Sequence, residues 1–242
     1  MEAAARVVWP NKGVVELEEY DVGEPGDGEV IVETEYTLIS PGTELAWLNA
    51  LPNTPGRYPQ HPGYNNVGRV GEVGPGVEGL TVGDRVVSPS AHSTRVRTNA
   101  DRIMRVPEGV HGEVAVYFNM CSIALGAVRK AGIELGEAVV VLGQGIIGNL
   151  AMQLASLSGG FPTIAVDLLD ERLALSQRCG ADLCINPSKE DLVGTLRRAL
   201  GREAVDVVFD ATGAPQGINE CFHLADYRGR VVLLASTRGI TD

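Results

Sequence analysis

The sequence of 242 residues predicts an α/β protein in which a β-rich N-terminal domain precedes a doubly wound parallel sheet. Two observations predict this fold class. Over about the first 110 residues, short apolar runs alternate with turn residues, which is typical of a compact barrel-like β domain. From Ala138 onward, apolar strands alternate with helical patterns, which is typical of parallel strands covered by helices. We therefore expect two domains, residues 1–120 and residues 121–242.

The first domain contains six short runs with the composition of strands. They are separated by turn sequences such as Pro-Gly-Asp-Gly and Gly-Pro-Gly. The expected strands are residues 6–9, 14–17, 29–34, 67–73, 85–87 and 93–96. The pattern then changes, and residues 112–131 are expected to form one helix that leads into the second domain.

A Gly-x-Gly-x-x-Gly turn opens the second domain, directly after the apolar run of residues 139–142. Gly143 permits a tight turn, Gly145 lets the backbone approach a pyrophosphate, and Gly148 lets the next helix pack close to the strand. The N–H groups at the start of that helix would bind phosphates. The predicted phosphate-binding residues are Gly143, Gly145, Ile146, Ile147 and Gly148.

A carboxylate follows where a dinucleotide-binding unit of the Rossmann type requires one. Asp167 ends the apolar run of residues 163–166, about twenty residues after Gly148, and would accept hydrogen bonds from the adenosine ribose. Such a carboxylate favours NAD(H) and repels the 2′-phosphate of NADP. Arg172 lies nearby in the sequence, and its cation could contact either the ribose or a phosphate. The sequence therefore predicts a Rossmann domain that binds NAD(H).

The rest of the second domain continues the alternation of helices and strands. Thr212 and Gly213 follow the strand of residues 205–210, and ligands bind outside the carboxyl ends of such strands, so we expect both residues to line the cofactor site. Five strands are expected in all, whereas the common doubly wound order has six, so about five of six strands are present and a C-terminal segment is expected to be missing. The remaining expected elements are helices 170–179 and 190–200 and strands 183–185 and 230–235.

The charge of the chain argues against some classes of binding partner. The chain has 20 basic and 31 acidic residues and a net charge of −11, which argues against nucleic acid or an anionic membrane surface as a partner. No apolar run is long enough for a membrane span, and the start lacks the apolar core of a signal peptide, so a cytoplasmic location is expected. The four scattered cysteines do not have the spacing of a zinc cluster.

Four motifs resemble the medium-chain dehydrogenase/reductase superfamily of the alcohol dehydrogenase type. In the family's order they are PGYNNVG at residues 62–68, VGPGV at 73–77, VGDRVV at 82–87 and GQGIIG at 143–148. The resemblance implies a GroES-like domain before the Rossmann domain. It also implies an oxidoreductase that acts on a small-molecule substrate with NAD(H), and a homodimer in a full-length form.

The departures from the family concern zinc. Zinc members have ligands where this chain has Pro41, Tyr64 and, by a rough alignment, Phe118. A catalytic zinc site needs thiolate, imidazole or carboxylate donors, so no metal is expected. The sequence LISPGTE at residues 38–44 is similar to a zinc-lacking branch that includes proteins similar to bacteriochlorophyllide a dehydrogenase.

Without a metal, a side chain must stabilise the charge that develops on the substrate oxygen. Thr43 aligns with a hydroxyl residue that relays protons in the family, and Tyr64 places a phenol where zinc members have an imidazole. We hypothesise that Tyr64 or Thr43 hydrogen-bonds this oxygen, although Tyr64 could equally fill the space of the metal. Glu44 is expected to make a fold-stabilising hydrogen bond, and His61 and His92 are expected to be ordinary histidines.

These observations predict a zinc-independent oxidoreductase that transfers a hydride between NAD(H) and an alcohol/ketone pair or an activated double bond. Two alternatives stay open. One is a quinone or enone reductase of the same fold, and the other is a non-catalytic dinucleotide-binding protein or a truncated fragment.

Overall fold

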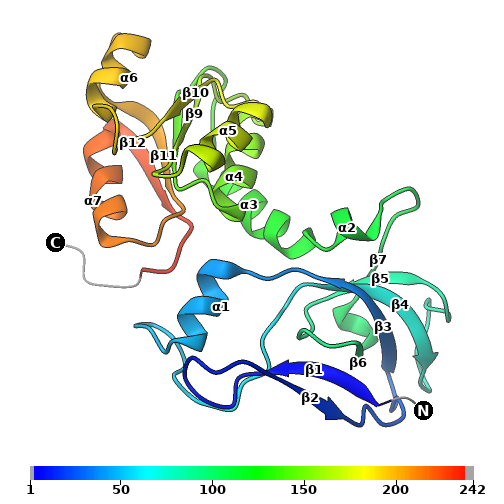
Figure 1. The fold of residues 1–242 in the computed structure, drawn as a ribbon. Helices are drawn as coiled ribbons and strands as arrows, with labels where there is room; N and C mark the ends of the chain where they lie inside the picture. The colour runs from blue at the N-terminus through cyan, green and yellow to red at the C-terminus, as the bar shows by residue number, and fades with distance from the viewer. Residues whose placement is uncertain (1–2, 238–242) are drawn as a thin grey trace. The chain divides into compact units, whose positions relative to one another are not determined.

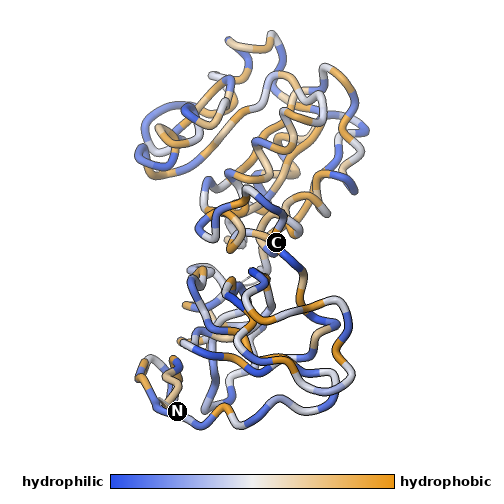
Figure 2. Tube along the Cα trace, turned by 90° about the vertical axis from the view of Figure 1, so that its right-hand side faces the viewer, coloured by the Kyte–Doolittle hydropathy of each residue, from blue (hydrophilic) through white to orange (hydrophobic). Residues whose placement is uncertain are grey.

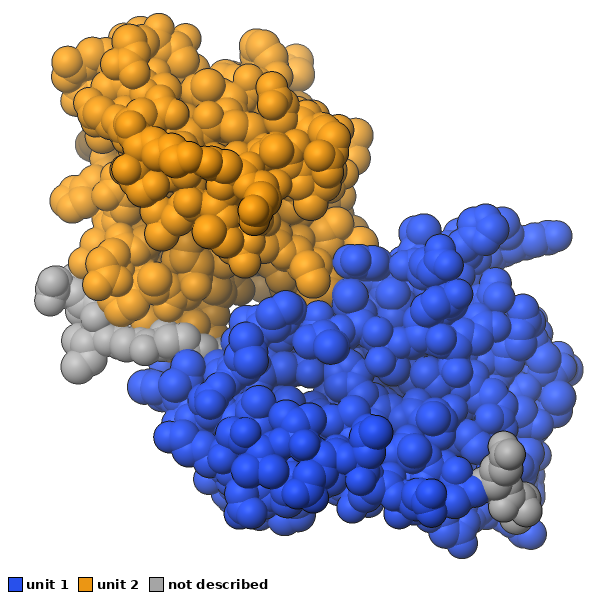
Figure 3. Space-filling model, viewed as in Figure 1, with its two compact units in different colours: residues 1–119 blue, residues 120–242 orange. Residues whose placement is uncertain are grey.

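A computed structural model describes residues 3–237. The chain divides into two compact units, residues 1–119 and residues 120–242, which are shown in two colours in Figure 3. Apolar residues run along the strands and helices of the second unit (Figure 2). Among the described residues, no helix is long and apolar enough to cross a membrane.

The first unit is built on a five-stranded antiparallel sheet with the strand order β6-β3-β4-β5-β7 (Figure 1). Buried valines of the four longer strands form its core. A separate antiparallel pair is formed by β1 (Ala4–Val8) and β2 (Glu16–Tyr20). The strands of the sheet are β3 (Glu29–Thr37), β4 (Asn66–Val73), β5 (Arg85–Ser88), β6 (Arg95–Asn99) and β7 (Met104–Arg105). The prediction of a β-rich N-terminal domain is confirmed.

Three helical segments in this part of the chain differ from expectation. Helix α1 (Pro41–Leu48) was not predicted, although Ser40 at the N-cap and proline at the first helical position are a start signal. A short 3₁₀ helix (Ala100–Arg102) precedes β7. The single helix expected over residues 112–131 is wrong: the structure has α2 (Gly112–Ala115) and α3 (Phe118–Ala131). The helix is interrupted at Val116 and Tyr117, and Val116 packs with Val67 in the core of the first unit.

The second unit contains a parallel sheet with the strand order β10-β9-β8-β11-β12 (Figure 1). This arrangement confirms the doubly wound sheet of five strands. The chain moves outward in opposite directions from β8, so the order reverses between β8 and β11, where such sheets bind ligands. The strands are β8 (Val139–Leu142), β9 (Thr163–Val166), β10 (Leu183–Ile185), β11 (Val205–Asp210) and β12 (Ala225–Leu233).

Alternate side chains of the strands enter two separate cores, because successive residues of a strand point to opposite faces. Val139 and Val141 of β8 pack with α3 and α4 (Ile146–Leu157), whereas Val140 and Leu142 pack with α6 (Leu192–Leu200) and α7 (Pro215–Leu224). Helix α5 (Asp170–Arg178) connects β9 with β10. Helices therefore cover both faces of the sheet, and its strand ends carry the predicted cofactor residues.

Candidate functional site

The Gly-rich turn joins β8 to α4 and has little room for side chains. Gly143 has a φ of +87°, which L residues rarely adopt. A Cβ at Gly148 would lie 1.8 Å from the carbonyl oxygen of Gly143, so the helix packs against the turn at van der Waals contact only because Gly148 has no side chain. A Cβ at Gly145, in contrast, would meet no atom within 4 Å. Open space therefore lies beside the backbone of Gly145.

This open space lies at the N-terminus of α4. Gly145 is the N-cap, and no side chain caps the helix. The N–H groups of Ile146 and Ile147 are in the first turn, where no intrahelical acceptor exists, and the helix dipole adds positive potential. Unpaired donors beside a side-chain-free backbone suit the pyrophosphate of a dinucleotide. The five predicted phosphate-binding residues are thus together in one turn.

Asp167 lies next to the same turn, at the end of β9. Its Oδ2 accepts a hydrogen bond of 2.6 Å from the backbone N–H of Gln144, and its Oδ1 accepts one of 2.9 Å from the N–H of Leu169. Arg172 Nη1 lies 3.3 Å from Oδ2, with half of its side chain exposed. A carboxylate oxygen accepts about two hydrogen bonds, so Oδ1 keeps capacity for a ribose hydroxyl. Arg172 contacts the carboxylate itself in this arrangement.

Sequence reasoning missed a buried network of polar side chains that supports the Gly-rich turn. The amide of Gln144 donates to the carbonyl oxygen of Val141 at 2.8 Å and accepts from Ser176 Oγ at 2.9 Å. Asn149 of α4 donates to the same Ser176 oxygen at 3.1 Å. The network joins the turn to α4 and α5. The one local signal of this network in the sequence is the polar Gln144 between Gly143 and Gly145.

Thr212 and Gly213 follow β11, but their polar groups are engaged by the protein. The Asp210 carboxylate, which is fully buried, accepts hydrogen bonds from the N–H of Thr212 at 3.0 Å, its hydroxyl at 2.5 Å, and the N–H of Gly213 at 3.2 Å. Burial, with the charges of Asp210 and Glu220, raises the pKa of the nearby Cys221 thiol to about 12. The three hydrogen bonds to Asp210 hold the backbone of this turn in one conformation.

Thr43 and Tyr64, the predicted catalytic residues, belong to the first unit. Thr43 is in the first turn of α1, and Tyr64 precedes β4. Both are half-buried, and neither hydroxyl has a hydrogen-bond partner among residues 3–237. Both hydroxyls are therefore available to hydrogen-bond a bound molecule.

The residues expected at the zinc-ligand positions of the family do not fit zinc. Pro41 has no donor atom, Phe118 is apolar, and a neutral phenol such as Tyr64 is not among the donors of catalytic zinc sites. Over the described part of the chain, no group of three His, Cys, Asp or Glu side chains could hold a metal ion. These three expected positions therefore offer one hydroxyl, that of Tyr64, and no thiolate, imidazole or carboxylate.

Glu44 and His92 form a buried pair close to these residues. The Glu44 Oε2 atom lies 2.9 Å from His92 Nε2, and Oε1 accepts a hydrogen bond of 2.8 Å from the backbone N–H of Ser40. Sequence reasoning considered Glu44 and His92 separately and missed the contact. His61, in contrast, is exposed and pairs with Glu18 at 3.0 Å. Hydrogen bonds from Arg6 and His61 hold the pKa of Glu18 below its usual value.

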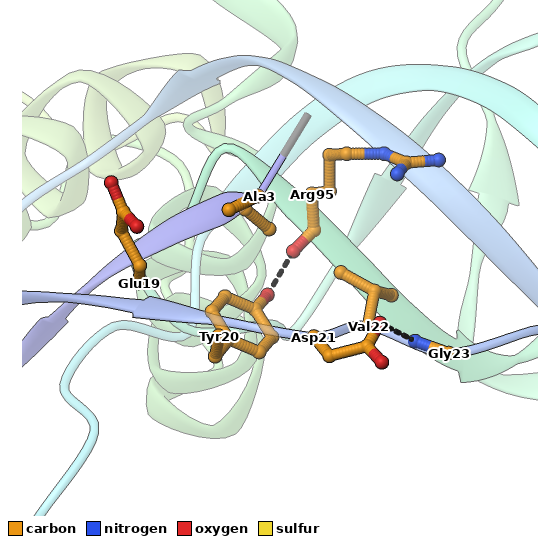
Figure 4. A pocket seen from close by; sticks show the side chains of 8 residues that line it. Ala3, Glu19, Tyr20, Asp21, Val22, Gly23 and Arg95 are labelled. Atoms are coloured by element: carbon orange, nitrogen blue, oxygen red, sulfur yellow. Dashed lines mark hydrogen bonds between the residues drawn. The ribbon is translucent and has the colours of Figure 1, made fainter. Parts of the chain in front are cut away.

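A surface hollow of the first unit lies away from this chemistry (Figure 4). Its polar contacts are internal, since the Tyr20 hydroxyl donates to the carbonyl oxygen of Arg95 and the N–H of Gly23 donates to Asp21. The guanidinium of Arg95 instead pairs with Glu33 and Glu72. None of the predicted site residues lines this hollow, which consists of Ala3, Ala4, Glu19, Tyr20, Asp21, Val22, Gly23 and Arg95.

Comparison with known proteins matches both units. Residues 26–130 match the alcohol dehydrogenase GroES-like domain, and residues 147–241 match the zinc-binding dehydrogenase family. The chain is 31% identical over 252 residues to the L-threonine 3-dehydrogenase of Pyrococcus horikoshii, covering 90% of this chain and 72% of that protein.

Two solved structures share the fold. A putative zinc-binding dehydrogenase from Sinorhizobium meliloti, bound to NADP, has a TM-score of 0.89 at 23% identity over 100% of this chain and 80% of that one. An alcohol dehydrogenase from Escherichia coli, in complex with NADH, has a TM-score of 0.84 at 24% identity over 95% of this chain and 75% of that one. The two neighbours thus differ in the dinucleotide that they hold.

Proposed function

The chain belongs to the zinc-type medium-chain alcohol dehydrogenase superfamily and is an oxidoreductase, and we propose that it transfers a hydride between NAD(H) and a small substrate without a catalytic zinc ion. The substrate class is an alcohol/ketone pair or an activated double bond. The observation that carries the proposal is the set of residues at the ligand positions, Pro41, Tyr64 and Phe118, which replaces metal donors by a free hydroxyl and two side chains that bind no metal.

The choice of NAD(H) is supported by Asp167. Its carboxylate is held at the turn by two backbone N–H groups, and its side chain is only 5% exposed. A 2′-phosphate would come close to this anion, whereas a 2′-hydroxyl can donate to Oδ1. Arg172 offsets part of the negative charge, but it is exposed and its contact with Asp167 is long at 3.3 Å. The buried carboxylate of Asp167 thus outweighs the exposed cation of Arg172, and the site favours the ribose hydroxyl of NAD(H) over the 2′-phosphate of NADP(H).

The nicotinamide, when bound, supplies the hydride chemistry. The turn at Gly145 and the N-terminus of α4 would bind the pyrophosphate, and Asp210 holds the turn at Thr212 in one shape. In the first unit, Tyr64 or Thr43 would donate a hydrogen bond to the substrate oxygen and stabilise the negative charge that develops there. When an alcohol is oxidised, the same hydroxyl would accept a hydrogen bond from the alcohol, and the proton released would pass to water.

The test of zinc independence is a metal analysis combined with a turnover assay. The panel contains L-threonine and 2-butanol with NAD⁺, and 2-butanone, methyl vinyl ketone and benzoquinone with NADH. We expect no stoichiometric zinc and unchanged turnover after treatment with a chelator. About one zinc ion per chain, removed with loss of activity, would contradict the proposal. Turnover of benzoquinone or methyl vinyl ketone alone would favour a quinone or enone reductase.

The test of the hydroxyl is the variant Tyr64→Phe, with Thr43→Val beside it. Loss of a donor to a developing oxyanion lowers kcat by about 10²–10³, and we expect this loss in one of the two variants with an unchanged Kd for NADH. Tyr36→Phe is the matched control, since Tyr36 is exposed and its hydroxyl, among residues 3–237, hydrogen-bonds only to Glu113 at 3.3 Å. Full turnover in both variants would remove these hydroxyls from the mechanism.

A further inference from the structure

The carboxylate of Glu44 joins two parts of the first unit. Its Oε1 accepts the N–H of Ser40 at the N-cap of α1, and its Oε2 lies 2.9 Å from His92 Nε2. Because a carboxylate only accepts hydrogen bonds, Nε2 is assigned as the donor in this pair. The two side chains are 10% and 9% exposed, so water screens their interaction little.

His92 is fixed by its backbone to the segment that contains Tyr64. Its N–H donates to the carbonyl oxygen of Pro62 at 2.8 Å, and its carbonyl oxygen accepts from the N–H of Val7 in β1 at 2.9 Å. Gly63 has a φ of +105°, and a Cβ there would lie 2.5 Å from the nitrogen and 2.9 Å from the Cγ of His92. The imidazole therefore packs directly on the residue before Tyr64.

The orientation of this imidazole depends on Glu44. Within residues 3–237, the buried Nδ1 of His92 has no hydrogen-bond partner, so Glu44 is the one side chain that holds the ring by a hydrogen bond. Glu44 directly follows Thr43 in α1, and Gly63 directly precedes Tyr64. The pair thus connects the two segments that carry the proposed catalytic hydroxyls.

We propose that the buried Glu44–His92 pair is a positioning device that fixes α1 to residues 61–66, so that Thr43 and Tyr64 hold the substrate oxygen in one geometry. Pro41 and Tyr64, two of the three positions where zinc members are expected to have ligands, lie in these same segments. A hydrogen bond between two buried side chains here holds together two segments that a shared metal ion would join in zinc members. The inference rests on the proposed function, because it assigns the pair to the same hydroxyls.

The test compares His92→Phe, His92→Gln and Glu44→Gln with the parent protein. Turnover is measured with the panel substrate that the parent converts fastest, NADH affinity by fluorescence, and backbone motion by hydrogen exchange. Arg97→Gln is the matched control, because it weakens an exposed contact with the Glu29 carboxylate, 3.5 Å away, in the same unit but outside residues 40–48 and 61–66.

We expect His92→Phe to lower kcat by about a hundredfold, since displacement of a catalytic group by about 1 Å has this effect. Exchange should rise in residues 40–48 and 61–66 and stay unchanged in the β3–β4 sheet, and the Kd for NADH should not change. His92→Gln keeps an N–H donor and should recover at least about tenfold of the lost rate. Glu44→Gln should show the same local rise in exchange, whereas the turnover of Arg97→Gln should stay within about twofold of the parent.

Two results would overturn the proposal. One is a rise in exchange throughout the first unit with normal turnover of the folded protein, which would make the pair a stabilising contact only. The other is parental exchange and turnover in Glu44→Gln. Failure of the proposed function is distinguishable: full turnover in both Tyr64→Phe and Thr43→Val would remove the hydroxyls from the reaction, whereas a localised rise in exchange in His92→Phe would still support the connection of the two segments.

Discussion

Two single-methyl substitutions in the Gly-rich turn separate dinucleotide binding from helix packing. A Cβ at Gly145 meets nothing within 4 Å, and its φ of −68° suits alanine, so Gly145→Ala adds a methyl group only to the open space. A Cβ at Gly148 lies 1.8 Å from the oxygen of Gly143, so Gly148→Ala must move α4 away from the turn. The first variant should affect binding, and the second should affect folding as well.

The magnitudes follow from these contacts. A methyl group forced between the backbone and a pyrophosphate costs about 1–3 kcal/mol, as overpacking does, which corresponds to a Kd for NADH raised by about 10- to 100-fold. Alanine at the N-cap costs about 1 kcal/mol of stability or less. In Gly148→Ala, the Cβ–oxygen distance must open from 1.8 Å to at least 3.0 Å. That strain exceeds the gain of about 0.5–1 kcal/mol from replacing glycine within a helix.

The assays are a fluorescence titration with NADH and thermal unfolding of each variant. Gly126→Ala is the control, because Gly126 is exposed within α3 and a Cβ there would meet no atom within 4 Å. It should raise stability by about 0.5–1 kcal/mol and leave the Kd unchanged. Parental NADH affinity in Gly145→Ala would refute the phosphate-binding role of the turn. Parental stability and affinity in Gly148→Ala would refute the close packing of α4.

Three further predictions concern the second unit. Asp167→Ser should raise the Kd for NADH by about tenfold and reduce the preference over NADPH; an unchanged ratio of the two Kd values would remove Asp167 from cofactor selection. Asp210→Ala leaves three donors of the turn without their acceptor and should cost about 3 kcal/mol, seen as a fall in Tm of roughly 10 °C; an unchanged Tm would contradict the role of this carboxylate. Because burial raises the pKa of Cys221 to about 12, its thiol should resist iodoacetamide at pH 8 until the protein unfolds. Rapid alkylation of Cys221 in the folded protein, identified by mass spectrometry, would contradict this prediction.

Local patterns predicted the parallel sheet closely, because each of its inner strands is a short, mostly apolar run with a glycine or an acid at its end. The observed bounds of β8, β9, β10 and β11 agree with the expected residues. Helices α1 and α7 were missed although both begin with proline in the first turn, since neither has a long apolar period. Strand β12 begins five residues earlier than expected, because Ala225 pairs with Val205 ahead of an irregularity in the register, and regular pairing resumes at Arg230.

The candidate site was predictable only where its residues are close in sequence. The turn from Gly143 to Gly148 carries its own signal, and Asp167 follows at a fixed spacing. The Glu44–His92 contact joins residues 48 positions apart, and the contact of Ser176 with Gln144 joins residues 32 positions apart. No local pattern specifies such pairs, because tertiary folding brings them together.

The central claim, that the second unit binds NAD(H), is tested most directly by titrating the purified 242-residue chain with NADH and NADPH side by side. Saturable binding of NADH, clearly tighter than that of NADPH, is the predicted result, because the Asp167 carboxylate accepts a ribose hydroxyl and repels a phosphate. Tighter binding of NADPH, or no saturable binding of either dinucleotide by a folded sample, would contradict it.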